Sequence, residues 1–181
     1  MNLTRQALGN YGTVLYTKMM AAYQAKDRDA FGQYSDRFMR LGMEMDSLLS
    51  TRHEFLLGKW LTDARNWGAT PAEKEYYERN AREIITTWHK AGGGLTDYSN
   101  RQWNGLLRTY YIPRWVEFVH RLNSSLNTGA SFDGKAFSAW CTSFEQGWVD
   151  SPSPVFSDTE KGDAVQLAYQ LFEKYKLAMM E

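Results

Sequence analysis

The stretch from Asp97 to Trp115 holds the side chains best suited to chemistry in this sequence. It interleaves acidic, amide and guanidinium groups with large aromatic rings: Asp97, Tyr98, Asn100, Arg101, Gln102, Trp103, Asn104, Tyr110, Tyr111 and Trp115. Flat aromatic faces suit the C–H faces of sugars and the polar groups suit sugar hydroxyls, so such a mixture is typical of a polar ligand pocket. A structural role stays open beside it, in which the rings pack a helix and Asp97 or Asn100 caps it.

Other reactive residue types give weaker signals. His53, His89 and His120 have no helical spacing to one another and no cysteine nearby, so we expect no metal site. Cys141 lies on an apolar stripe and is interpreted as a small buried hydrophobic residue. Gly92–Gly94 lacks the flanking strand and the lysine of a phosphate-binding loop, so it is interpreted as a loop and not as a nucleotide site. We therefore predict no cofactor. Carboxylates follow solvated helical faces, and no pair stands out as a catalytic pair.

Length and charge exclude several classes of protein. The 181 residues match one domain, on a prior of roughly 100–200 residues per domain. Lys+Arg and Asp+Glu both number 21, so the chain lacks the basic excess of a nucleic-acid-binding protein and we expect no nucleic-acid partner. No apolar run approaches the roughly 18–20 residues of a membrane span, and no signal peptide is visible.

Composition and periodicity predict an all-α fold. Leu, Ala and Met far outnumber Val and Ile, and only four prolines occur. Apolar residues recur at spacings of three and four in these stretches: 3–22, 31–49, 55–67, 76–88, 103–122, 137–148 and 165–175. We therefore predict a single domain over residues 1–181, an irregular bundle of about seven helices with short loops.

Local signals place some of the boundaries between these helices. Thr70-Pro71-Ala72-Glu73 predicts a capping box that opens a helix. Pro113 is expected to kink or interrupt the helix that carries it. Asn123–Gly134 is interpreted as a polar connection and Ser151–Pro154 as a stiff linker.

The central stretch resembles a known family. Residues 97–106, DYSNRQWNGL, and 110–115, YYIPRW, are similar to the C-terminal helical domain of the α-N-acetylglucosaminidases. Residues 2–6 resemble the start of that domain, and residues 55–61, with Trp88 downstream, resemble its middle. The resemblance runs in order from about Asn2 to about Lys176, with Ser99 standing where an alanine is expected.

The resemblance implies a specific activity for the enzyme but not for this chain alone. The family removes terminal α-linked N-acetylglucosamine by a retaining mechanism, with two glutamates on a central (β/α)8 barrel. Nothing in this chain matches the barrel, so no catalytic residue is predicted and the chain alone is expected to be inactive. The implied partners are the barrel of the same enzyme and a glycan ending in N-acetylglucosamine. The implied location is extracytoplasmic, lysosomal in animals and secreted or periplasmic in bacteria.

Two roles for the motif follow from the resemblance. In the first, residues of the motif approach the mouth of the barrel and bind the substrate: Asp97, Tyr98, Asn100, Gln102 and Trp103. In the second, Asp97 and Asn100 cap a helix, Arg114 pairs with a buried carboxylate, and Trp115 packs beside it. If the chain packs on a barrel, an apolar patch rich in Trp and Tyr is expected on its surface. A free-standing carbohydrate-binding module and a helical interaction module without a catalytic role remain the alternatives.

Overall fold

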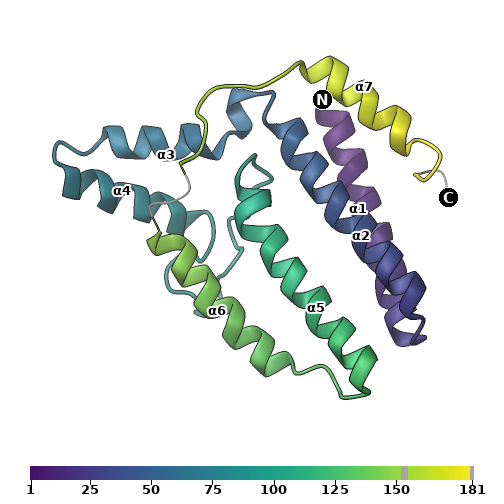
Figure 1. The fold of residues 1–181 in the computed structure, drawn as a ribbon. Helices are drawn as coiled ribbons and strands as arrows, with labels where there is room; N and C mark the ends of the chain where they lie inside the picture. The colour runs from purple at the N-terminus through teal and green to yellow at the C-terminus, as the bar shows by residue number, and fades with distance from the viewer. Residues whose placement is uncertain (152–154, 180–181) are drawn as a thin grey trace.

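The computed structural model describes residues 1–151 and 155–179, and in these residues the chain is helical with no strand (Figure 1). The elements in chain order are α1 (Asn2–Gln24), α2 (Arg28–Leu49), the 3₁₀ turn η1 (His53–Phe55), α3 (Leu57–Asn66), α4 (Pro71–Ile84), the π-helical turn η2 (Leu107–Tyr111), α5 (Ile112–Thr128), α6 (Gly134–Asp150) and α7 (Ala164–Tyr175). The all-α prediction is thus confirmed, with seven α-helices in the described part.

The helices form an elongated bundle. Figure 1 shows α1 and α2 as a long pair, α5 and α6 beside them, and α3 and α4 at the far end. Leu8 and Leu15 of α1 pack with Leu48 of α2 and Leu171 of α7 in one apolar cluster. The other end has its own cluster, in which α3, α4, η2 and α6 meet: Leu57, Leu61, Ala81, Ile85, Leu106, Tyr110, Trp148 and Val149. The apolar stripes seen in the sequence therefore face these cores.

The predicted capping box opens α4. The Thr70 hydroxyl accepts a hydrogen bond from the Glu73 backbone N–H at 3.2 Å, and the Glu73 carboxylate accepts from the Thr70 N–H at 3.0 Å. Pro71 occupies the first turn, where its missing N–H costs nothing. These groups satisfy donors that a helix start leaves free.

The helix predicted over residues 103–122 begins later than expected and is divided. Trp103 precedes the regular structure, and η2 turns into α5 at Ile112, one residue before Pro113. A proline has no N–H to donate, and its ring collides with the carbonyl four residues earlier. The wider π turn directly before Pro113 relieves this conflict.

The polar connection predicted over Asn123–Gly134 is wrong in its first half, because α5 continues to Thr128. Leu126 extends the apolar stripe of Leu122 by one turn and packs with the cluster of Met19 and Phe31. Gly129, with φ 74°, then ends the helix in a left-handed conformation. The helix predicted to reach Trp88 likewise ends early, at Ile84.

Two further sequence predictions concern linkers and membranes. Most of the linker predicted at Ser151–Pro154 lies outside the described residues, which omit 152–154. Among the residues that are described, none of the helices has the length and apolarity needed to cross a membrane.

Candidate functional site

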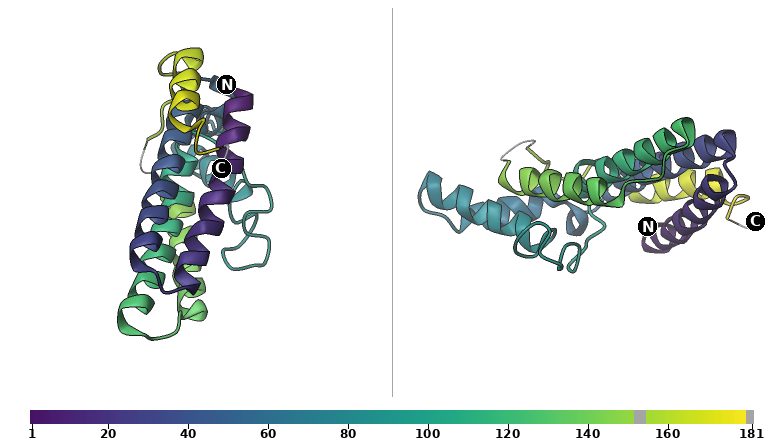
Figure 2. Two further views of the ribbon diagram at one scale, coloured as in Figure 1. Left: turned by 90° about the vertical axis from the view of Figure 1, so that its right-hand side faces the viewer. Right: turned by 90° about the horizontal axis from the view of Figure 1, so that it is seen from below.

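The Asp97 motif lies on an irregular loop between α4 and η2. Figure 2 shows this segment projecting from one side of the helices. Asp97 has φ 63°, a left-handed conformation that aspartate tolerates better than most residues, and Trp88 has φ 65°. The Asp97 backbone N–H donates to the carbonyl of Thr86 at 2.7 Å, and Thr86 is fully buried. The loop is therefore tied to the end of α4 at the residue of greatest chemical interest.

A network of three charged side chains holds the loop to α5 and α6. The two terminal nitrogens of Arg114 donate to the two Asp97 carboxylate oxygens at 3.0 and 2.7 Å. The Arg114 Nε lies 3.2 Å from an oxygen of Glu145, a residue only 3% exposed. Such a bidentate pair is strong and directional. The prediction that Arg114 pairs with a buried carboxylate is confirmed.

The helix cap predicted at Asp97 or Asn100 is wrong. No helix begins at either residue, because the next regular turn starts after Leu106, whose side chain makes no capping hydrogen bond. Both carboxylate oxygens of Asp97 accept hydrogen bonds from Arg114 instead. A long-range partner has therefore replaced the local one that the sequence suggested.

Burial shapes the electrostatics around Arg114. Its guanidinium lies 5.0 Å from the centre of the Tyr110 ring and 5.9 Å from that of Tyr111. Burial raises the pKa of Tyr111 to about 12 and raises the pKa of Glu145 above its usual range. Two carboxylates share one guanidinium here, so the cluster carries no spare positive charge.

A cavity of about 470 Å³ opens beside this network. Its polar rim comes from Asp97, Asn100 and Arg114. Its aromatic wall comes from Tyr16, Tyr111, Trp115, Phe118 and Phe137. A mostly apolar cavity with a few polar groups is the usual form of a small-molecule site.

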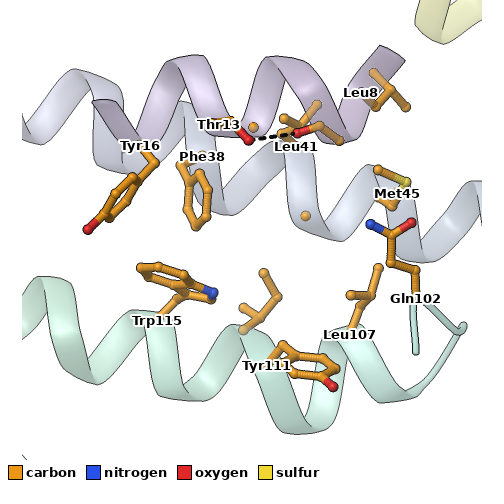
Figure 3. Close-up of a pocket in the computed structure, with 14 residues that line it drawn as sticks. Leu8, Thr13, Tyr16, Phe38, Leu41, Met45, Gln102, Leu107, Tyr111 and Trp115 are labelled. Atoms are coloured by element: carbon orange, nitrogen blue, oxygen red, sulfur yellow. Dashed lines mark hydrogen bonds between the residues drawn. The ribbon is translucent and has the colours of Figure 1, made fainter. Parts of the chain in front are cut away.

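A second, more apolar cavity of about 340 Å³ adjoins the first and shares Tyr16, Tyr111 and Trp115 with it. Figure 3 shows Tyr16 of α1 and Trp115 of α5 facing one another at one end, with Gln102 at the other. The Tyr16 and Trp115 ring centres are 5.7 Å apart. The shared rings make one aromatic boundary between the two cavities.

The five predicted sugar-binding residues lie along one loop and have different local surroundings. Asp97 and Asn100 line the polar cavity, while Tyr98 is 72% exposed with its ring 5.2 Å from that of Trp88. Gln102 lines the apolar cavity and accepts a hydrogen bond from the Arg5 guanidinium at 2.6 Å. Trp103 is half-buried, with its ring 5.8 Å from that of Trp60.

The sequence analysis did not identify Asp46, a residue of α2 whose side chain forms hydrogen bonds with the start of η2. Its side chain is fully buried and accepts hydrogen bonds from the Gly105 N–H at 2.7 Å and the Asn104 amide at 2.9 Å. The backbone N–H and the Nε of Arg108 each donate to it at 3.2 Å. Burial raises the pKa of Asp46, and the hydrogen bonds from Gly105 and Arg108 oppose that shift.

One signal in the sequence could have found Asp46. It is a carboxylate set among the apolar residues Met45, Leu48 and Leu49 of α2, all of which are buried. A buried carboxylate is costly unless several donors satisfy it. The aromatic residues Tyr16, Phe118 and Phe137 were also missed, because only the packing of three helices brings them to the cavity.

Comparison with known proteins identifies the family. The profile of the α-N-acetylglucosaminidase (NAGLU) C-terminal domain matches residues 1–174. The chain belongs to this family. The chain is 33% identical over 176 residues to the human α-N-acetylglucosaminidase. This match covers 97% of the chain and 23% of the human protein.

The fold of this C-terminal domain is shared with solved glycoside hydrolases. A family 89 glycoside hydrolase from Clostridium perfringens, in complex with 2-acetamido-1,2-dideoxynojirmycin, superposes with a TM-score of 0.87 at 32% identity. That match covers 98% of this chain and 21% of the hydrolase. A variant of the Clostridium enzyme in complex with its substrate GlcNAc-alpha-1,4-galactose gives a TM-score of 0.86 at 30% identity, over 97% of this chain and 21% of that one. The domain thus spans about a fifth to a quarter of these relatives.

Proposed function

We propose that this chain is the non-catalytic domain of an α-N-acetylglucosaminidase and packs on a catalytic (β/α)8 barrel. The observation that carries the proposal is the match of residues 1–174 to the C-terminal domain family. The relatives extend well beyond the matched part, which leaves room in them for a barrel with the two glutamates of a retaining glycosidase. In this proposal residues 1–181 form a single domain and act outside the cytoplasm.

The proposed contact with the glycan is made by the loop residues that the sequence singled out. These residues border the pocket for a terminal α-linked N-acetylglucosamine: Asp97, Tyr98, Asn100, Gln102 and Trp103. Arg114 supports this role because it fixes the Asp97 carboxylate through two hydrogen bonds. A loop held in this way presents its side chains with little loss of conformational entropy on binding.

Exposed aromatic residues support packing on a further domain. Trp67 at the end of α3 is 82% exposed, and Tyr76 and Tyr77 of α4 are 60% and 40% exposed. The Tyr76 and Tyr77 rings lie 5.8 Å apart, and exposed apolar groups that gather on a surface commonly mark an interaction site. These exposed side chains on α3 and α4 support the expectation of a surface rich in Trp and Tyr.

Hydrolysis of a chromogenic α-N-acetylglucosaminide tests the proposal. The assay compares this chain alone with a longer chain that adds the barrel. We expect turnover only with the longer chain, because the two glutamates would lie on the barrel. Turnover by the 181 residues alone would contradict the proposal and would point to Asp97, Glu117 or Glu145 as catalytic carboxylates. An inactive longer chain that folds normally would also contradict it.

A further inference from the structure

We propose that the apolar cavity between α1, α2 and α5 binds a medium-chain aliphatic carboxylate. The inference goes beyond the proposed function and does not depend on it, because the ligand is an alkyl chain and not a sugar. The cavity has a volume of about 340 Å³, at the lower end of the range of small-ligand sites. Among the described residues that line it, none has an acidic or basic side chain.

The apolar cavity is elongated along three helices. Figure 3 shows α1 and α5 on its two sides, with Phe38, Leu41 and Met45 of α2 between them. Leu8 and Tyr16 of α1 both line the cavity, so it follows that helix for about 12 Å at a rise of 1.5 Å per residue. An extended alkyl chain fits this long and apolar shape.

Glycines of α1 keep the cavity open. Gly9 and Gly12 both line it, and a Cβ on Gly12 would meet the Leu41 side chain at 3.6 Å, an ordinary van der Waals contact. Alanine would therefore fit at Gly12, and alanine is the more favourable residue inside a helix. Glycine at this position leaves space that the packing of the helices does not require.

Three aromatic rings close the end of the cavity that lies away from Gln102. The Trp115 ring centre is 4.9 Å from that of Phe38 and 5.7 Å from that of Tyr16. The rings pack edge to face against one another and so give this end an apolar wall. The methyl end of an alkyl chain suits this wall.

The opposite end carries a guanidinium without a carboxylate partner. Arg5 lies on the same face of α1 as Gly9 and Gly12, because residues four and seven apart share a helical face. Its guanidinium donates to the Oε1 of Gln102 at 2.6 Å, and Gln102 lines the cavity. Arg5 makes no ion pair with any described residue, and its Nε is buried without a hydrogen-bond partner there. A ligand carboxylate at this end would therefore meet an uncompensated cation.

A second cation adds positive charge next to Gln102. The Arg101 guanidinium donates to the backbone carbonyls of Ser99 and Asn100, each at 2.9 Å, and makes no ion pair within the described part of the chain. Carbonyl oxygens carry no net charge, so they do not neutralise Arg101. Positive charge at one end of an uncharged, apolar cavity favours a ligand with an apolar chain and one negative end.

Calorimetric titration of the chain with octanoate, with ¹H–¹⁵N NMR to locate the site, tests the inference. We expect saturable binding with a Kd of about 1 mM or tighter. The amide signals of Gly9 and Gly12 and the indole N–H of Trp115 should shift. Butyrate should bind at least about tenfold more weakly, because it buries fewer CH₂ groups. The absence of saturable binding at tens of millimolar octanoate, or shifts confined to other regions, would overturn the inference.

Octanamide, the uncharged analogue of octanoate, tests the role of Arg5. The parent chain should prefer octanoate by about three- to tenfold. In Arg5→Gln this preference should fall to about twofold or less. Arg37→Gln, at an exposed arginine of α2 outside the cavity, should keep the preference of the parent. Equal preferences in the two variants, or octanamide binding to the parent as tightly as octanoate, would overturn the inference.

Matched glycine variants test the location of the chain. Gly12→Ala places a methyl group in the cavity and should weaken octanoate binding about threefold or more. Gly32→Ala, on α2 with no neighbour within 4 Å, should leave the affinity unchanged. Neither variant should lower Tm, because alanine favours a helix more than glycine does, so weaker binding would not reflect unfolding. Equal affinities of the two variants for octanoate would overturn the inference.

Discussion

Replacing Asp46 with alanine tests whether a buried carboxylate fixes the start of η2. Asp46 is fully buried on α2 and receives four hydrogen bonds from three residues beyond it: Asn104, Gly105 and Arg108. Asp46→Ala removes every acceptor atom of this side chain at once. The Gly105 N–H is buried, so it would lose its partner without gaining water.

The expected cost follows from the burial of each donor. A buried donor left unpaired costs about 1–3 kcal/mol, which applies to Gly105. The half-buried Asn104 amide and Arg108 N–H add about 1 kcal/mol each. The Arg108 side chain is 51% exposed, so its ion pair adds little. We expect Asp46→Ala to lose about 3–5 kcal/mol of the free energy of unfolding.

Thermal and urea unfolding of the 181-residue chain measure this loss. At about 2–4 °C for each kcal/mol in a chain of this size, Tm should fall by roughly 6–20 °C. Asp46→Asn is the matched control, because it keeps the volume and one acceptor for Gly105, and it should cost about 1–2 kcal/mol. An Asp46→Ala chain as stable as the Asp46→Asn chain would refute the reasoning.

Three other predictions follow. A Cβ on Gly58 would lie 2.1 Å from the Ser157 carbonyl oxygen, so Gly58→Ala should cost about 3 kcal/mol in urea unfolding. Gly32→Ala, with no neighbour within 4 Å on α2, should instead gain about 0.5–1 kcal/mol, and the opposite order would contradict the packing. Burial raises the pKa of Glu145 in the folded chain. Ionisation of Glu145 as pH rises therefore lowers the free energy of unfolding. The free energy of unfolding of Glu145→Gln should therefore rise relative to that of the parent as pH rises from below 4.5 to 7. If the difference in free energy of unfolding between variant and parent does not change with pH, the pKa of Glu145 is not raised in the folded chain. Tyr98 is 72% exposed, so Tyr98→Ala should leave Tm unchanged while lowering kcat/KM of the barrel-containing chain about tenfold, whereas full activity would remove Tyr98 from the pocket.

Local sequence determined the helices and several of their ends. The spacing of apolar residues predicted all seven helical regions, because a helix places residues three and four apart on one face whatever surrounds it. The capping box at Thr70 and the interruption near Pro113 were predictable for the same reason, since both depend on neighbours within four residues.

Tertiary structure alone decided how the loop and its cavity are built. Asp97 pairs with Arg114, 17 residues away, rather than capping a nearby helix, and Gln102 pairs with Arg5 across 97 residues. Asp46 meets Gly105 across 59 residues, and Tyr16 reaches Phe118 and Phe137 only where three helices converge. Residue type shows that a side chain can form a hydrogen bond or stack, but its partner depends on distances set by the packing of the whole chain. The sequence therefore determined the helices and the chemical character of the motif, and only the packed chain determined which atoms meet.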